Sequence, residues 1–486
     1  MSRSRLSQWR KRTSRLVGLL SLFLTTGPLS AQTANPMPLR FGGNIELSVG
    51  QPASLPQVEP TIAVNPKDPK NLVAGYFGRT SAKSAHPCFI VFTTDGGATW
   101  VPAGTTPLAA DVDDCFDPSL AADARGNFYY SYLDIRKDPQ GDSIPDIRVA
   151  RSTDGGRTFS QSSVAVMGGV PFNQPEPDKD WIAVDTWPKS RFQGTLYVSF
   201  TDITDLGQGL VQMIRVVVSR DGGRSWSSPV VLSRFIPIQQ IGVVEGVQDS
   251  VPAVAPDGTV FVFYMDYNKP NRRTAIKFSK SKDGGRSWSA PADAAADLPS
   301  PGFFLLDNGD PKFGSPVIGI SASSFPTVAV APDGTISVAW TDFPHGTCFG
   351  TGVDPACVNA DVRLARSRDG GETWSAPQKV SDDATTTDQF FPWIAAHPGG
   401  LLSLTWLDRR LDSSGLDYDL FYTNTPDGKS FLPNVRVTTA SSKVDSTWDG
   451  GDYNSLAVTS DGIFPVWNDA RFTSVQIFTA RGTFPP

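Results

Sequence analysis

One eight-residue motif recurs along this 486-residue chain and restricts the folds that the chain can adopt. Each copy has Ser or Thr first, Asp third, Gly-Gly next and Trp or Phe last. Five copies occupy residues 93–100, 152–159, 219–226, 281–288 and 367–374. A sixth, eroded copy reads Thr-Pro-Asp-Gly-Lys-Ser-Phe at 425–431. Self-similarity at such intervals indicates a repeat architecture.

The residue types of the motif predict a tight turn between two strands. An Asp carboxylate accepts hydrogen bonds from backbone N–H groups of a turn, and glycine adopts backbone angles that other residues avoid. The final aromatic residue buries a large apolar surface. Each copy is therefore interpreted as a structural clasp rather than a catalytic element.

A second repeat, a pair of short strands with a Pro-Asp-Gly-like turn as in 326–342, precedes each motif. Seven such pairs begin near Pro60, Pro118, Trp181, Val251, Pro326, Pro392 and Ser455. A third strand follows each pair, for example 147–152 and 362–367. Together these units predict an all-β, seven-bladed propeller, with six blades as the alternative.

The last repeat lacks an outer strand because the chain ends, while the segment 44–49 is left unassigned at the beginning. We expect this N-terminal strand to complete the last blade, which would close the ring and remove a free sheet edge. Composition agrees with an all-β fold: 44 Gly and 40 Pro accompany acidic residues that are nearly all Asp, a turn former, rather than Glu.

The N-terminus has the pattern of a secretory signal peptide. Six basic residues precede the apolar run Leu16 to Leu24, and small residues ending at Ala31 follow it. We assign 1–31 to the signal peptide, 32–43 to a linker and 44–486 to one propeller domain, in a secreted or periplasmic protein. An uncleaved anchor is the alternative.

Charge and cysteines narrow the function classes. Removing the six basic residues of the signal segment leaves 37 Lys and Arg against 49 Asp and Glu, a net charge of about −12, which argues against nucleic acid and anionic membranes as partners. Cys88 with Cys115, and Cys348 with Cys357, form two local pairs expected to be disulfides. Their spacing does not suit a metal site, and we expect no cofactor.

Loops that precede the first strand of each unit share one face with loops that follow the second strand, opposite the Asp-Gly-Gly turns. The first set supplies Glu59, Asp117, Lys179, Asp180, Asp249, Asp388, Asp452 and Tyr453. The second set supplies an Asp in six of seven units, which is explained by a capping role. Arg136, Arg410 and Arg471 follow that Asp in three units only. They would either grip a carboxylate or form salt bridges at the rim.

The Asp-Gly-Gly motif is identified as the Asp box, and the chain resembles the sialidase superfamily. The resemblance implies an arginine triad on the sugar carboxylate, an Asp acid/base and a Tyr nucleophile paired with Glu. Carried over, these roles fall on Arg136, Arg410 and Arg471, on Asp117 or Glu59, and on Tyr453 with Glu245. Two departures are the missing Arg-Ile-Pro segment, replaced by Glu59-Pro-Thr-Ile, and seven blades instead of six.

Two hypotheses follow. The first is a secreted, sialidase-like glycoside hydrolase of the exo-α-sialidase type that acts on acidic-sugar glycans at the mouth of the channel. The alternative is a non-catalytic propeller that binds a protein or polysaccharide partner. In both, we expect a monomer with a glycan or glycoprotein ligand, without membrane insertion.

Two further features of the sequence, its acidic loops and one long connection, each have two interpretations. The aspartates at 134, 138, 142 and 146, and those at 408, 412, 417 and 419, would offer oxygen ligands to calcium, but a solvated acidic loop is the preferred interpretation. The long connection 291–324 would either roof the channel or pack on a neighbouring blade.

Overall fold

The computed structural model describes residues 39–81, 86–108, 112–137, 140–169, 175–207, 209–237, 245–268, 273–298, 303–307, 319–342, 359–413, 417–443 and 451–484. These residues form strands and turns and contain no helix. Accordingly, nothing in this part of the chain is a helix that is long and apolar enough to cross a membrane. The predicted signal peptide and the Cys348–Cys357 pair lie outside the described residues.

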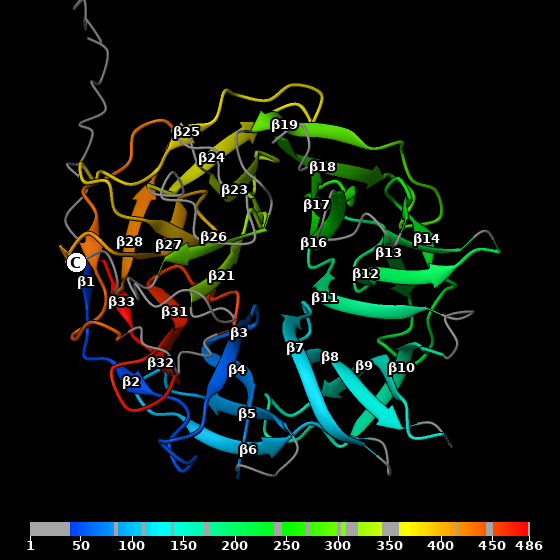
Figure 1. Ribbon diagram of the computed structural model, residues 1–486, viewed down its shortest axis with the longest axis horizontal. Coiled ribbons are helices and arrows are strands. Elements are labelled where there is room, and N and C mark those ends of the chain that lie inside the picture. Colours follow the sequence, from blue (N-terminus) through cyan, green and yellow to red (C-terminus); the bar gives the residue numbers. More distant parts are fainter. Residues whose placement is uncertain are drawn as a thin grey trace, which may run out of the picture. The chain divides into compact units, whose positions relative to one another are not determined.

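Seven antiparallel sheets of four main strands surround a central channel (Figure 1). Blade 1 consists of β3 (Gln57–Asn65), β4 (Asp68–Gly78), β5 (Cys88–Thr93) and β6 (Val101–Thr105). Blade 2 consists of β7 (Val112–Ala122), β8 (Phe128–Lys137), β9 (Ser143–Ser152) and β10 (Gln161–Val166). Blade 3 consists of β11 (Glu176–Val184), β12 (Leu196–Asp205), β13 (Leu210–Ser219) and β14 (Val230–Val231), with β15 (Ile236–Pro237) beside β13.

Blades 4 to 6 follow the same order. They consist of β16 (Glu245–Val254), β17 (Val260–Asn268), β18 (Arg273–Ser281) and β19 (Ala292–Leu298); β22 (Thr327–Val330), β23 (Ile336–Asp342), β24 (Asp361–Ser367) and β25 (Gln378–Lys379); and β26 (Gln389–Ala396), β27 (Leu402–Asp408), β28 (Asp419–Thr425) and β29 (Val435–Arg436). A separate hairpin of β20 (Phe303–Asp307) and β21 (Gly319–Ser323) lies between blades 4 and 5 in the sequence.

The seventh blade joins the two ends of the propeller. It consists of β30 (Ser455–Val458), β31 (Gly462–Asp469), β32 (Gln476–Thr479) and, as outer strand, β2 (Ile45–Glu46). Ile45 pairs with Thr479, which confirms seven blades completed by an N-terminal strand; the six-bladed alternative is wrong. A further strand, β1 (Arg40–Phe41), falls within the stretch assigned to a linker and pairs with β33 (Gly482–Thr483).

The Asp-Gly-Gly turns have the geometry that their residue types predict. In the copy at 219–226, Asp221 Oδ1 accepts hydrogen bonds from the backbone N–H groups of Arg224 (2.9 Å) and Ser225 (3.0 Å). Gly222 and Gly223 have φ angles of 74° and 80°, where side chains are disfavoured. The aromatic residue at the end, Trp226, packs in the apolar layer between blades 2 and 3. Each turn therefore fastens its blade to the preceding one.

A disulfide joins blades 1 and 2. Cys88 on β5 and Cys115 on β7 are bonded, with their Cα atoms 5.5 Å apart, as the sequence predicted. On the opposite side of the channel, the connection 291–324 contributes Ser323, whose Oγ donates to Asp249 Oδ2 at 2.8 Å. The end of the β20–β21 hairpin is thus attached to the channel wall of blade 4.

Candidate functional site

Each inner strand places one side chain at the same level of the channel. These positions lie four residues before a recurring alanine (63, 121, 183, 253, 329, 395 and 457). The side chains are Glu59, Asp117, Lys179, Asp249, Phe325, Phe391 and Tyr453. We call this set the channel ring.

Backbone geometry at the ring is unusual and repeated. Five of its members, none of them glycine, have φ between 49° and 60°: Glu59, Asp117, Lys179, Asp249 and Phe391. In each of these blades the strand register shifts at this point, as it does between Val58 and Thr61. A left-handed conformation costs a non-glycine residue about 1 kcal/mol or more. Its recurrence in five blades indicates that it belongs to a β-bulge that the inner strands share.

Four aromatic side chains pack together at the channel ring. Phe325 and Tyr453 are members of the ring, and Trp181 and Trp393 each lie two positions after a member. Trp181, Phe325, Trp393 and Tyr453 come from four blades and contact one another, with ring centres 4.8 Å apart for Trp181 and Trp393 and 5.3 Å for Trp181 and Tyr453. All four are buried. They form an apolar floor beneath the charged members of the ring.

Lys179 lies on this floor. Its Nζ is 3.7 Å from the centre of the Tyr453 ring, 4.7 Å from that of Trp181 and 4.8 Å from that of Phe325. The side chain is buried and its Nζ makes no hydrogen bond with the described residues. Cation–π attraction therefore holds the ammonium group in a position where it also faces the acidic half of the ring.

Six carboxyl groups surround this ammonium, those of Glu59, Asp117, Asp178, Asp180, Asp249 and Asp452. Burial raises the pKa of Asp180 well above its usual range. Burial and the nearby charges of Asp117 and Asp452 raise the pKa of Glu59 well above its usual range. The same causes raise the pKa of Asp178 to about 7. Burial and Asp452 raise the pKa of Asp249 to about 7, and burial raises that of Asp452 to about 6. Lys179 lowers each of these five values, because its charge favours the ionised carboxylates.

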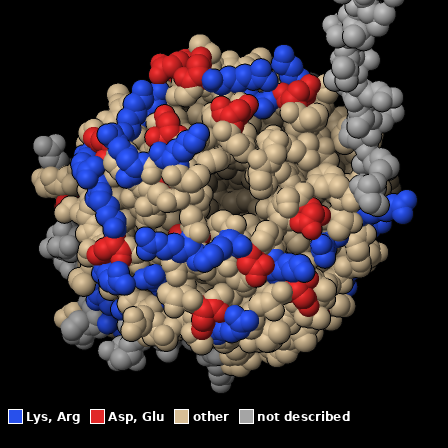
Figure 2. All heavy atoms as spheres, turned by 180° about the vertical axis from the view of Figure 1, so that it is seen from behind, with Lys and Arg blue, Asp and Glu red and all other residues tan. Residues whose placement is uncertain are grey.

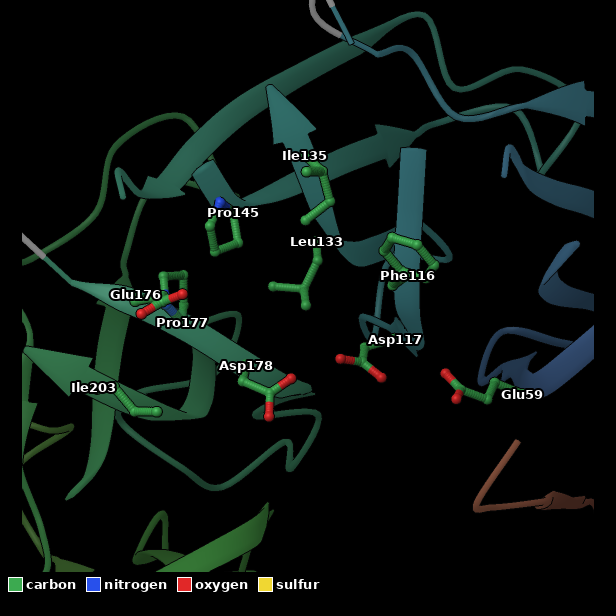
Figure 3. A pocket seen from close by; sticks show the side chains of 10 residues that line it. All are labelled: Glu59, Phe116, Asp117, Leu133, Ile135, Pro145, Glu176, Pro177, Asp178 and Ile203. Atoms are coloured by element: carbon green, nitrogen blue, oxygen red, sulfur yellow. The ribbon is translucent and has the colours of Figure 1, made fainter. Parts of the chain in front are cut away.

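Three of these carboxyls open into one pocket of about 480 Å³ between blades 2 and 3. In Figure 3, Asp117 lies between Asp178 and Glu59, and the three groups face the same space. Glu176 stands at the far side. The apolar part of the lining consists of Phe116, Leu133, Ile135, Pro145, Pro177 and Ile203.

Contacts across blades hold the carboxylate of Asp117 and the backbone of Glu59 in this pocket. The backbone N–H of Lys179 donates to Asp117 Oδ2 at 3.1 Å, which links blade 3 to blade 2. The backbone N–H of Glu59 donates to Asn468 Oδ1 at 3.0 Å, which links blade 1 to blade 7. The positions of both residues therefore depend on contacts between neighbouring blades and not on one blade alone.

The arrangement suits proton transfer. A carboxyl that keeps its proton near neutral pH can act as a general acid, and a second carboxyl beside it can act as base or stabilise a developing positive charge. Glu59, Asp117 and Asp178 place three carboxyl groups side by side against an apolar wall on which a sugar ring would rest.

Of the predicted catalytic residues, the structure brings Glu59, Asp117 and Tyr453 together. Tyr453, however, is only 1 % exposed, and its hydroxyl donates to the backbone oxygen of Pro118 at 3.2 Å. Burial, followed by the charges of Glu59 and Asp117, raises its pKa well above 10. A tyrosine nucleophile needs the opposite change, so this geometry favours a packing role for Tyr453.

Glu245 is not among the carboxylates that act on Tyr453. It begins β16, and its Oε2 accepts a hydrogen bond from Arg234 Nη1 at 2.7 Å. Arg234 also binds Asp266, the aspartate that follows the second strand of blade 4. Glu245 thus belongs to an ion-pair network of blade 4.

The three predicted substrate-binding arginines are each bound at the edge of a separate blade. Arg136 pairs with Asp146 (3.0 Å), Arg410 with Asp408 (2.7 Å) and Arg471 with Asp469 (2.7 Å). Arg410 also binds Asp382, and Arg471 also binds Asn44 and Thr439. The three arginines therefore form salt bridges at the rim, as one of the two interpretations of the sequence expected. Their guanidinium groups do not line the carboxyl pocket.

In the acidic loops that would offer ligands to calcium, aspartates form ion pairs with nearby basic side chains. Asp134 pairs with Arg148, Asp417 with Lys443 and Asp419 with Arg436. Among the described residues, no group of His, Cys, Asp or Glu has the arrangement of a metal site.

Sequence reasoning placed Lys179, Asp249 and Asp452 on the correct face but gave them no role, and it missed Asp178. Alignment of the seven inner strands on their shared alanine would have revealed the ring. Asp178 carries no such signal, since it reaches the pocket from the position before the ring residue of blade 3.

Comparison with known proteins extends the resemblance. No protein-family model matches the chain. A sialidase of Micromonospora viridifaciens is 27% identical over 275 residues, which is 50% of this chain and 37% of that protein. The match thus spans little more than a third of that relative, and over this stretch the chain is sialidase-like in sequence.

Solved structures with a similar course of the chain include a protein of unknown function from Dyadobacter fermentans (TM-score 0.47, 11% identity, 92% of this chain and 99% of that one). A leech intramolecular trans-sialidase has a TM-score of 0.42 at 14% identity, over 92% of this chain and 70% of that one. An α-L-arabinofuranosidase of Fusarium graminearum has a TM-score of 0.46 at 15% identity, over 76% and 92% of the two chains.

Proposed function

We propose that the protein is a glycoside hydrolase whose reaction takes place in the carboxyl pocket at the mouth of the channel. The observation that carries this proposal is the convergence of Glu59, Asp117 and Asp178 on one space with an apolar wall. Acid–base cleavage of a glycosidic bond needs two carboxyl groups in different protonation states. The sequence similarity to a sialidase supports the same reaction class.

The substrate that we propose carries no negative charge at the sugar that occupies the pocket. An exo-α-sialidase specificity would need cations on the sugar carboxylate, but Arg136, Arg410 and Arg471 are held in rim ion pairs. The described lining contains four carboxyl groups and no basic side chain. A neutral glycan therefore fits this pocket better than a sialoside.

A panel of chromogenic glycosides tests the proposal. Neutral pentosides and hexosides are compared with a sialoside, using the unmodified protein, Asp117→Asn and Glu59→Gln. We expect turnover on a neutral member and a loss of about a hundredfold or more in both variants, the usual contribution of general acid–base catalysis. Asp297→Asn, at a carboxylate that is 88% exposed, is the matched control and should retain activity.

Absence of turnover on the whole panel, or equal turnover in all variants, would contradict a hydrolase. Saturable binding of a glycan without turnover would instead support the second hypothesis, a non-catalytic glycan-binding propeller. The burial of Tyr453 and the dispersed arginines are what favour that alternative.

We also propose that the protein is exported. The basic and apolar N-terminus and the Cys88–Cys115 disulfide both suit an oxidising compartment. Mass spectrometry of the exported protein should show an N-terminus at Gln32; recovery of the chain with residues 1–31 attached would contradict cleavage at the proposed position.

A further inference from the structure

Four arginines line one pocket on the opposite side of the propeller. Arg125 and Arg151 belong to blade 2, and Arg220 and Arg224 flank the Asp-Gly-Gly turn of blade 3. The pocket measures about 280 Å³ and lies between the two blades. Because the Asp-Gly-Gly turns join third and fourth strands, they lie at the blade ends opposite the carboxyl pocket. Figure 2 shows the face turned away from the viewer in Figure 1, where Lys and Arg side chains alternate with Asp and Glu around the central hollow.

None of these four guanidinium groups has a carboxylate partner within 4.0 Å among the described residues. Arg220 donates to the backbone oxygen of Gly284 (2.6 Å) and Arg224 to that of Asp221 (2.7 Å). Arg151 Nε is buried without a hydrogen-bond partner. Since a guanidinium group has five N–H donors, most of the donors in this pocket remain available to a ligand.

The two aspartates of the pocket are already occupied. Asp123 accepts hydrogen bonds from the backbone N–H groups of Arg125 and Asn127, and from the Tyr129 hydroxyl at 3.0 Å. Asp221 accepts those of its own turn, which together lower its pKa. Their oxygens stabilise turns, so they do not satisfy the arginine side chains.

The equivalent pocket between blades 4 and 5 shows that this charge pattern is not a requirement of the fold. It measures about 410 Å³ and is lined by Lys280, Lys282 and Arg368 but also by Asp257, Asp333, Asp369 and Glu372. Glu372 occupies the turn position of Arg224, and it pairs with Lys280 at 2.6 Å. Between blades 3 and 4, the Phe192 ring lies against Gly284 of the Asp-Gly-Gly turn.

We propose that the arginine pocket binds an oxyanion group, carboxylate or sulfate, of an acidic polysaccharide. Planar guanidinium groups bind such oxyanions with paired hydrogen bonds. Arg125, Arg220 and Arg224 are exposed, so the pocket is accessible to a group on an extended chain rather than only to a buried ion. The protein as a whole is acidic, with a formal net charge of −6, so general attraction to polyanions does not explain such a cluster. This site would anchor the protein on a polymer while the opposite face stays open.

Calorimetric titration of the full chain with defined oligosaccharides at low salt tests the proposal. The probes are a sulfated oligosaccharide, an oligogalacturonate, a neutral oligosaccharide of equal length and inorganic sulfate. We expect one site for a charged oligosaccharide and none for the neutral one. The double variant Arg125→Glu with Arg224→Glu should bind about tenfold more weakly or worse. Added salt should also weaken binding by the unmodified protein.

Arg157→Glu with Arg286→Glu is the matched control. Both arginines are exposed, and each donates to the backbone oxygen of the Asp in its own turn (2.6 and 2.7 Å), as Arg224 does. The control should bind within about threefold of the unmodified protein. Equal losses in the two double variants, or binding of inorganic sulfate as tight as that of either charged oligosaccharide, would overturn the proposal. The readout is binding, so it is independent of any glycosidase activity.

Discussion

The ammonium group of Lys179 lies 3.7 Å from the centre of the Tyr453 ring, so a cation from blade 3 is bound to an aromatic ring from blade 7 across the channel. The same ammonium group lowers the pKa of five surrounding carboxyls. One side chain thus connects the packing of the floor with the charge balance of the proposed site. It also explains how so many acidic groups are tolerated at the centre of the molecule.

Replacement of Lys179 should destabilise the protein in a pH-dependent manner. Lys179→Met removes the cation and leaves the carboxyls to repel one another. We expect a loss of about 3 kcal/mol or more in unfolding free energy at pH 8, as for a broken buried ion pair. The loss should be smaller at pH 5, where the carboxyls bind protons. Urea unfolding at both pH values measures the difference.

Lys189→Met is the control for this experiment, because Lys189 is exposed. Its unfolding free energy should change by less than about 0.5 kcal/mol at either pH. A loss in Lys179→Met that is the same at pH 5 and pH 8 would indicate that only packing was removed.

The stability of the protein should fall as the pH rises from about 4 to 8. Asp249 has a folded-state pKa of about 7, above the value of about 3.9 in an unfolded chain. A raised pKa stabilises the folded state below the unfolded value, and this contribution is lost as the pH rises through the folded value. Asp452, at about 6, acts in the same direction.

Asp249→Asn should reduce this pH dependence by roughly 4 kcal/mol, since the amide stays neutral throughout. Asparagine keeps an oxygen that accepts the hydrogen bond of Ser323. The unfolding free energies of the variant and the unmodified protein are measured with urea at intervals of half a pH unit. An increase in stability of the unmodified protein over the same range would show that the carboxyls are ionised and well compensated in the folded state.

Asn44 should prove important for closure of the ring. Its Oδ1 accepts hydrogen bonds from Arg471 Nη2 (2.8 Å) and the backbone N–H of Thr439 (2.7 Å), and its Nδ2 donates to Val437 O (2.9 Å). Asn44→Ala should lower the unfolding free energy by about 1–3 kcal/mol. Gln51→Ala, in the same N-terminal segment, is the control. Similar thermal midpoints for the two variants would contradict the importance of this attachment.

Arg410→Ala should affect stability and leave the chemistry of the pocket unchanged. Arg410 binds Asp408, which is fully buried, and truncation would strand that carboxylate at a cost of about 3 kcal/mol. Turnover on a neutral glycoside, measured well below the unfolding temperature, should remain within about twofold. A large fall in kcat with unchanged stability would instead restore the arginine to the site that the family resemblance implied.

The fold was predictable because its determinants are local and repeated. The Asp-Gly-Gly turns, the seven strand pairs and the spare strand at 44–49 each follow from short-range rules of turn geometry and strand pairing. The site was only partly predictable. Glu59 and Asp117 were found because they directly precede the strands predicted to begin near Pro60 and Pro118, whereas Asp178 reaches the pocket only through the way blades 2 and 3 face each other.

The roles of individual side chains depended on contacts between distant parts of the chain. Arg410 and Arg471 follow the same Asp-x-Arg pattern that a carboxylate-binding cluster would show, but their partners Asp382 and Asn44 come from other turns and strands. Local sequence therefore determined that this protein is a propeller, which end carries the acidic residues and how the ring closes. Only the tertiary structure decided which charges neutralise one another, because ion pairs and pKa values depend on distances and burial that arise when all seven blades are assembled.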